Sequence, residues 1–268
     1  MAEQNTARQQ EIYSRVQAQF GQAAAGYTQS GVHRDPAALE KVVELAQPQP
    51  GDVALDIATG AGHVAMALAP HVARVIAYDM TEDMLEETRQ SAAARRLNNL
   101  ATQKGTAEGL PFMRATFDII TVRHAPHHFA NLKKAIGEMA RVAKVGARIV
   151  IVDSCAPEDA ALDRQWNYME KLRDPSHVRN YRASEWRTMM AAAGLRIVFE
   201  ELDCCTENGG PMNFADWALR MRTPASAVQE LSRLFRSASP ALAEALRVQI
   251  KGDMIFFAVP QITIAAIR

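Results

Sequence analysis

Apolar side chains recur at helical spacing in the first part of the chain. Between residues 7 and 25 they stand four positions apart, at Ile12, Val16, Phe20 and Ala24. This spacing places them on one face of an amphipathic helix. A second helix is expected over residues 36–46, with Pro36 in its first turn, and the run QPQPGD at 47–52 ends it. Residues 1–46 are therefore predicted to form an N-terminal helical cap.

From residue 53 onward, short apolar segments alternate with amphipathic ones. Strands are expected at 53–57, 73–78, 100–104, 117–122 and 148–152. Helices are expected between them at 62–70, 82–96 and 131–143. Short, continuously apolar strands separated by helices are typical of a parallel sheet covered on both faces. The pattern predicts an α/β fold with a Rossmann-like, doubly wound sheet.

The alternation is interrupted after residue 153. The pattern there predicts helices at 158–173 and 184–193, a loop at 174–182, a strand at 195–204, a mostly helical stretch at 213–250 and strands at 254–258 and 261–267. We therefore expect a core over residues 47–268 with helical insertions at about 156–182 and 211–252.

Composition narrows the class of protein. The chain has 268 residues, and its 30 basic residues balance 30 acidic ones, so no global charge favours nucleic acid. No run approaches the roughly 18 apolar residues of a membrane helix. Cys155, Cys204 and Cys205 form neither a disulfide framework nor a metal-ligand pattern. We expect a soluble, cytoplasmic protein without a metal site.

The segment VALDIATGAGHVA, residues 53–65, contains the strongest candidate for a ligand site. A strand ends near Asp56, a turn of small residues follows, and a helix begins near Gly62, where free N–H groups can meet an anionic ligand group. Gly60 and Gly62 also fit a dinucleotide fingerprint, and Asp79 follows Gly60 by 79 − 60 = 19 residues, a spacing that suits a ribose-binding acid.

Asp56 separates the two cofactor classes. An acid beside a dinucleotide pyrophosphate would be unfavourable, whereas it suits the α-amino group of S-adenosylmethionine. The alternatives are a tight strand-to-helix connection without a ligand and an acid that only caps the helix.

These residues resemble the class I methyltransferases, in particular the UbiE/YcgJ-like branch. The segment LDIATGAG matches the first motif of that family, with Ala58 in place of its first glycine. Residues 75–89 resemble the second motif, and this resemblance implies that Asp79 holds the ribose hydroxyls and that Met80 packs against the adenine of S-adenosylmethionine. It also implies a seventh, antiparallel strand at residues 261–267.

The resemblance continues through two later motifs. Residues 105–112 resemble the adenine-binding turn, which implies that Thr106, Ala107 and Glu108 lie beside the adenine; many relatives carry an acid where this chain has Thr106. Residues 117–129 resemble the motif after the fourth strand. This places Arg123 and His124 beside the methionine portion of the cofactor. Tyr27 either bonds the cofactor carboxylate or anchors the cap.

Methyl transfer needs a general base only where the acceptor is a poor nucleophile. His128 is the first candidate, because the end of the fourth motif faces the methyl group in related folds; its alternative is a structural histidine that shapes the loop. His127 should point elsewhere. The late aromatic residues either form a lid over an apolar acceptor or pack in the core: Trp166, Tyr168, Trp186, Phe214 and Trp217.

The leading hypothesis is a methyltransferase that moves a methyl group from S-adenosylmethionine to a small organic acceptor, with S-adenosylhomocysteine as product. Whether carbon, oxygen or nitrogen is methylated stays open, as does a homodimer. The alternative is an S-adenosylmethionine-binding protein of the same fold that does not methylate, either another enzyme or a sensor. A nicotinamide oxidoreductase ranks below both.

Overall fold

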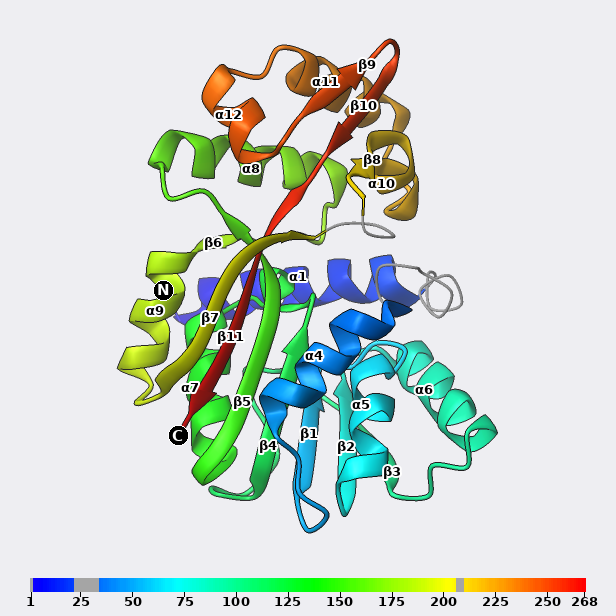
Figure 1. Cartoon of the computed structure of the whole chain (residues 1–268), viewed down its shortest axis with the longest axis vertical. Helices are drawn as coiled ribbons and strands as arrows, with labels where there is room; N and C mark the ends of the chain where they lie inside the picture. Colours follow the sequence, from blue (N-terminus) through cyan, green and yellow to red (C-terminus); the bar gives the residue numbers. More distant parts are fainter. Residues whose placement is uncertain (1, 22–33, 206–209) are drawn as a thin grey trace.

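The computed structural model describes residues 2–21, 34–205 and 210–268. In the described part of the chain, seven strands lie side by side in the order β3-β2-β1-β4-β5-β11-β7 (Figure 1). Neighbouring strands from β3 to β5 are parallel, whereas β11 runs antiparallel to both β5 and β7. The predicted doubly wound sheet with its antiparallel last strand is confirmed.

The strands of this sheet follow the apolar segments of the sequence. They are β1 (Val53–Ile57), β2 (Arg74–Asp79), β3 (Leu100–Lys104), β4 (Phe117–Arg123), β5 (Ala143–Ala156), β7 (Arg196–Cys205) and β11 (Val259–Ile267). The helices around it are α4 (Pro36–Ala46), α5 (His63–Leu68), α6 (Glu82–Ala94), α7 (Leu132–Val142) and α9 (Ala183–Ala192). β5 is much longer than the strand predicted at 148–152, because it continues through polar positions at both of its ends.

Two hydrophobic cores lie on opposite faces of the sheet. On one face, α4 and α5 pack Val42, Val64 and Leu68 against small and branched side chains of the strands. On the other face, α7 and α9 pack larger side chains, among them Ile136 and Trp186. Alternate residues of each buried strand serve the two faces, which explains why these strands are continuously apolar in sequence.

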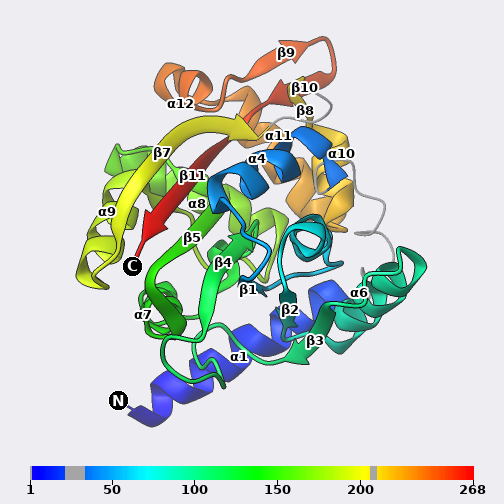
Figure 2. The same cartoon turned by 60° about the horizontal axis from the view of Figure 1, so that its bottom comes forward.

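Helix α1 (Ala2–Gly21) crosses the end of the sheet where β1, β2 and β4 finish (Figures 1 and 2). The helix begins at Ala2, whereas the sequence pattern predicted its start at residue 7. Gln17 reaches the backbone oxygen of Met80 at 3.2 Å, so α1 is attached directly to the loop after β2. Ala24, Tyr27 and His33, which the sequence placed in the cap, lie outside the described residues.

The late part of the chain forms a separate layer above that end of the sheet. It contains α8 (Ala160–Arg173), α10 (Phe214–Arg220), α11 (Ala225–Arg236), α12 (Pro240–Ala245) and a three-stranded sheet of β8 (Met212–Asn213), β10 (Met254–Phe257) and β9 (Gln249–Lys251). The prediction of helix up to residue 250 was therefore wrong at its end, where β9 pairs antiparallel with β10. The loop predicted at 174–182 likewise ends in a short strand, β6 (Tyr181–Arg182), paired with β5.

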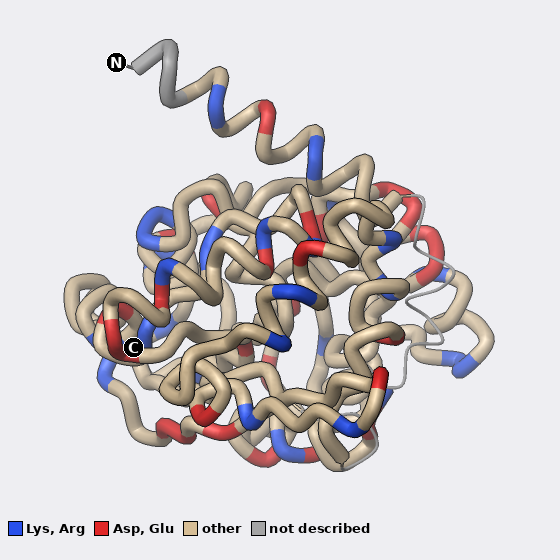
Figure 3. Tube along the Cα trace, turned by 90° about the horizontal axis from the view of Figure 1, so that it is seen from above, with Lys and Arg blue, Asp and Glu red and all other residues tan. Residues whose placement is uncertain are grey.

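Charge is distributed evenly over the molecule. Lysine and arginine positions are interspersed with aspartate and glutamate in the view from above (Figure 3). Among the described residues, no helix is both long and apolar enough to cross a membrane.

Candidate active site

A pocket opens at the ends of β1, β2 and β4, where the loops after these strands meet α1. Its empty space is about 1040 Å³, the open mouth included. Residues predicted to bind the cofactor make up much of its wall: Asp56, Ala58, Gly60, Asp79, Met80, Thr106, Ala107, Glu108, Arg123 and His124. His128 lines the pocket as well. Gly62 lies behind this wall, and Tyr27 falls outside the described residues.

The loop after β1 requires left-handed backbone at alternate positions. Ala58, Gly60 and Gly62 have φ values of 52°, 55° and 80°. Ala58 thus keeps the conformation that a glycine would adopt more easily. A Cβ added at Gly62 would lie 2.6 Å from Cγ2 of Thr88, whose hydroxyl donates to the Gly60 oxygen at 2.8 Å. The glycine at position 62 is therefore needed for packing against α6 as well as for its dihedral angles.

Both carboxylate oxygens of Asp56 accept hydrogen bonds inside the protein. The Thr59 hydroxyl and the Ala65 N–H donate to Oδ2 at 2.6 and 3.2 Å, and the Thr121 hydroxyl donates to Oδ1 at 2.7 Å. Burial raises the pKa of Asp56 to about 6, although the hydrogen bonds from Thr59 and Thr121 lower it. A cation beside this acid would stabilise its charged form, so Asp56 fits the α-amino group predicted to face it.

Asp79 connects the end of β2 to the loop after β1. Its Oδ2 accepts from the Gly60 N–H at 3.0 Å and its Oδ1 from the Thr81 N–H at 2.8 Å. Burial raises the pKa of Asp79, and the backbone hydrogen bonds act in the opposite direction. Each carboxylate oxygen keeps a further lone pair, which suits the two hydroxyls of a ribose.

The turn predicted to bind adenine packs under α1. A Cβ at Gly105 would lie 1.9 Å from the hydroxyl oxygen of Tyr78, so only glycine allows the turn to approach β2 this closely. Glu108 is 3% exposed, and its Oε2 accepts from the Tyr13 hydroxyl at 2.9 Å. Tyr13 was not among the site residues predicted from the sequence. Its position three residues before Val16 and seven before Phe20, which puts it on the same face of α1, was the available signal.

Comparison with known proteins agrees with this geometry. The methyltransferase domain family matches residues 48–194. The methyltransferase YcgJ of Bacillus subtilis is 34% identical over 251 residues, which cover 93% of this chain and 97% of that protein. The chain belongs to the class I S-adenosylmethionine-dependent methyltransferases.

Solved structures and a second relative support the branch within this family. The crystal structure of YcgJ superposes with a TM-score of 0.80, covering 87% of this chain and 98% of that one. A methyltransferase structure from Bacillus halodurans gives a TM-score of 0.81 at 33% identity, covering 86% and 98% of the two chains. The UbiE C-methyltransferase of Zymomonas mobilis is 34% identical over 111 residues, 41% of this chain and 46% of that protein. The chain is thus an S-adenosylmethionine-dependent methyltransferase with a Rossmann-like fold.

The methyltransferase has a second cavity next to the first, of about 640 Å³. Phe20, His124 and His128 line both cavities and so form the wall between them. The far side of the second cavity comes from the late layer and from β11: Glu170, Arg173, Met212, Trp217, Arg220, Met221, Val259 and Gln261. His127, expected from sequence to point elsewhere, lines this second cavity and not the first.

His128 is held between two elements. Its Nδ1 lies 3.1 Å from the Ser176 backbone oxygen, which can only accept, so Nδ1 is assigned the proton. Its ring packs edge to face against the ring of Phe20, with 5.0 Å between the two ring centroids. Burial and the charge of His127 lower the pKa of His128 to about 3. A neutral, buried ring with such a low proton affinity favours the structural role over that of a general base.

The late aromatic side chains mostly pack in cores. Trp166, Trp217 and Phe214 share one cluster of the late layer, and Trp186 belongs to the core under α9. Of these four only Trp217 lines one of the two cavities, while Tyr168 is exposed. The arrangement favours core packing over an aromatic lid for Trp166, Trp186 and Phe214, and neither role for the exposed Tyr168.

Proposed function

We propose that this methyltransferase holds S-adenosylmethionine in the first pocket and a small organic acceptor in the second cavity. The observation that carries the proposal is the shared wall of Phe20, His124 and His128 between the two cavities. A methyl group passes in line between donor and acceptor, so the two ligands need adjoining compartments that open to each other at one point. A sensor of S-adenosylmethionine would need only the first pocket.

The proposed cofactor contacts follow the walls of the first pocket. Asp79 accepts from the ribose hydroxyls and Asp56 faces the α-amino group. Met80, Thr106, Ala107 and Glu108 surround the adenine, and Arg123 and His124 lie beside the methionine portion. Gly60 and Ala58 let the backbone approach the ligand, and Gly62 supports them from behind. When bound, S-adenosylmethionine supplies a methyl group activated by its sulfonium.

The protein's own contribution to the reaction is positioning. The carboxylates of Asp56 and Asp79 and the ring of His128 are buried and hydrogen-bonded, so they keep their orientation before either ligand binds. Helix α1 contributes Val16 and Phe20 to the roof of the first pocket, where they exclude water from the point at which the cavities meet. No described side chain of the first pocket needs to react covalently.

A labelled-methyl experiment tests the proposal. Protein is incubated with S-adenosylmethionine labelled in its methyl group and with fractionated small metabolites. We expect label to appear in a small molecule, together with S-adenosylhomocysteine, and the Asp79→Ala variant to abolish both. Tight cofactor binding without any transfer over the whole set of fractions would contradict the proposal and favour the non-methylating alternative.

Two expectations complete the proposal. A cytoplasmic location is tested by fractionating cells that express the protein at its natural level. A homodimer is tested by light scattering over a range of protein concentrations, where a mass of one chain at every concentration would exclude it.

A further inference from the structure

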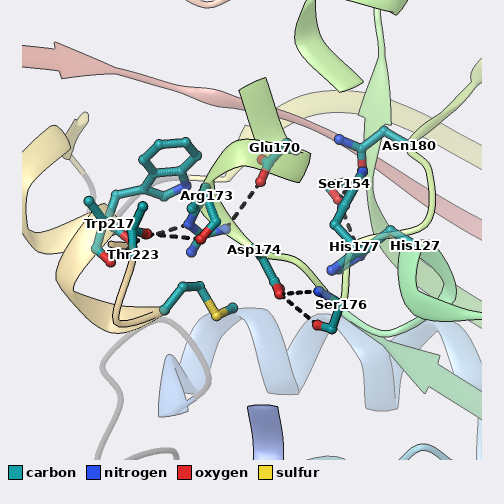
Figure 4. Close-up of polar contacts among 12 residues, drawn as sticks. His127, Ser154, Glu170, Arg173, Asp174, Ser176, His177, Asn180, Trp217 and Thr223 are labelled. Atoms are coloured by element: carbon teal, nitrogen blue, oxygen red, sulfur yellow. Dashed lines mark hydrogen bonds and ion pairs between the residues drawn. The ribbon is translucent and has the colours of Figure 1, made fainter. Parts of the chain in front are cut away.

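His127 and Asp153 form a close pair beside the second cavity. His127 Nδ1 lies 2.6 Å from Oδ1 of Asp153, which is 1% exposed at the carboxyl end of β5. The Ser154 hydroxyl lies 3.3 Å from the same nitrogen. Figure 4 shows His127 and Ser154 together with the polar groups of α8 and the loop after it.

The hydrogen-bond network assigns the tautomer of His127. The Ser154 hydroxyl donates its proton to Oδ1 of Asn180 at 2.6 Å, so towards His127 it can only accept. Asp153, when charged, is also only an acceptor. Both partners therefore require a proton on Nδ1 of His127, which leaves Nε2 as the nitrogen with a free lone pair.

We infer that Nε2 lies at the accessible edge of the ring. The His127 side chain is 15% exposed and lines the second cavity, while its Nδ1 edge is occupied by buried Asp153. A histidine oriented by a carboxylate through Nδ1, with Nε2 available, is the arrangement that serves as a proton acceptor in hydrolases.

The neighbouring charges favour proton uptake at His127 over His128. The ionisable groups that act on the His127 ring are Asp153 from β5, Glu170 and Asp174 from α8 and its end, and the histidines at 128 and 177. Burial lowers the pKa of His127, but Asp153, Glu170 and Asp174 together outweigh it and the net direction is upward. The pKa of His128 and of His177 is lowered, mainly by burial. Of the three adjacent rings, only His127 has its basicity increased.

We propose that His127, positioned by Asp153, accepts the proton of an acceptor molecule in the second cavity, and that this acceptor is a phenol or enol. The inference rests on the proposed function. As the acceptor atom forms its bond to the methyl carbon, the sulfur–methyl bond breaks and its electron pair stays on sulfur. The acidic proton of the acceptor moves to Nε2 of His127 and from there to solvent, so the step needs no further reactant.

The lining of the second cavity supports this class of acceptor. Phe20, Met212, Met221 and Val259 offer an apolar surface for a flat carbon skeleton. Arg173 lines it too and is paired with Glu170 at 3.2 Å. A phenol or enol is acidic enough for an imidazole to deprotonate, whereas an aliphatic alcohol is not.

The probe para-nitrophenol tests the inference, because its anion absorbs visible light and its neutral form does not. It is titrated with pH in the presence of the protein loaded with S-adenosylhomocysteine. We expect bound probe to ionise at lower pH than free probe. In His127→Gln the bound probe should ionise like the free one, and Asp153→Asn should reduce the shift. His71→Gln, at an exposed histidine, should leave it unchanged.

The outcomes separate the inference from the proposed function. Calorimetry with S-adenosylhomocysteine is run on every variant; its failure with the wild type would remove the proposed function and the inference with it. Two results with the wild-type protein would overturn the inference and leave the proposed function standing. In the first, the cofactor binds but the probe does not; in the second, the bound probe ionises at the same pH as the free probe. With a phenol that is turned over, His127→Gln should lower kcat by about a hundredfold or more while KM changes little; equal kcat values would also overturn it.

Discussion

The carboxylate of Asp79 accepts a hydrogen bond of 3.0 Å from the backbone N–H of Gly60. Asp79 is the last residue of β2, and Gly60 lies in the loop after the neighbouring parallel strand β1. This contact, together with the bond from the Thr59 N–H to the Tyr78 oxygen at 3.1 Å, therefore sets the distance between the two segments. The same carboxylate is expected to hold the ribose. Cofactor recognition and loop geometry are thus coupled through one side chain.

Replacing Asp79 should therefore affect binding more than a lost ribose contact would. In Asp79→Ala the N–H groups of Gly60 and Thr81 lose their buried acceptor, at a cost of about 1–3 kcal/mol each. We expect the affinity for S-adenosylmethionine to fall by about a hundredfold or more, measured by titration calorimetry. Glu44→Gln, an exposed acid on α4, is the control that should bind normally. Unchanged affinity in Asp79→Ala would mean that the ribose site lies elsewhere.

Cofactor affinity should depend on pH through Asp56. Its pKa is raised to about 6 in the free protein, and a cationic amino group beside it would lower that value. Below about pH 6 the acid must lose a proton when the cofactor binds, so affinity should rise as pH increases up to that value and then level off. Calorimetry in buffers of different ionisation enthalpy should detect proton release near pH 5.5, a value about half a unit below that pKa.

The Asp56→Asn variant is the reference for this measurement. It should bind more weakly and release no proton from this position. Equal proton release in the variant and the wild type would assign the linkage to another group.

Gly62→Ala should destabilise the protein. The new Cβ would lie 2.6 Å from Cγ2 of Thr88 and would occupy a backbone with φ of 80°. Left-handed strain and overpacking together should lower the free energy of unfolding by about 2–4 kcal/mol, measured by urea denaturation. Gly137→Ala is the matched control, because nothing lies near its Cβ position on helix α7; it should raise stability by about 0.4–1 kcal/mol. A neutral Gly62→Ala would show that α6 can move away.

Tyr13→Phe should loosen α1 from the first pocket. The variant removes the donor of the 2.9 Å bond to Glu108, which is almost completely buried. Oε2 of Glu108 then lacks a donor in a buried position, at a cost of about 1–3 kcal/mol, while Oε1 keeps the N–H of Asn131 at 3.2 Å. We therefore expect faster hydrogen exchange along α1 and about tenfold weaker cofactor binding. Tyr168→Phe, at an exposed tyrosine, should change neither property. If exchange along α1 is the same in both variants, this hydrogen bond does not hold the helix.

Local patterns in the sequence determined most of the fold. Continuous apolar strands require burial on both faces, so the sheet could be predicted. The turn of small residues after Asp56 allows a ligand to approach the backbone closely, so a cofactor loop could be proposed there. The segments 249–251 and 181–182 could not, because their strands exist only through pairing with β10 and β5.

Only the tertiary structure decided which histidine lies beside the proposed acceptor cavity. From the sequence, His128 ranked above His127 as the candidate base, because a motif does not show the surroundings of each of two adjacent histidines. Folding places His127 against buried Asp153 and beside the second cavity, and it places His128 against Ser176 and Phe20. Which imidazole has the higher proton affinity is decided by the charges and the burial around each ring. Those surroundings come from β5, α1 and the loop after α8, which are distant in the chain.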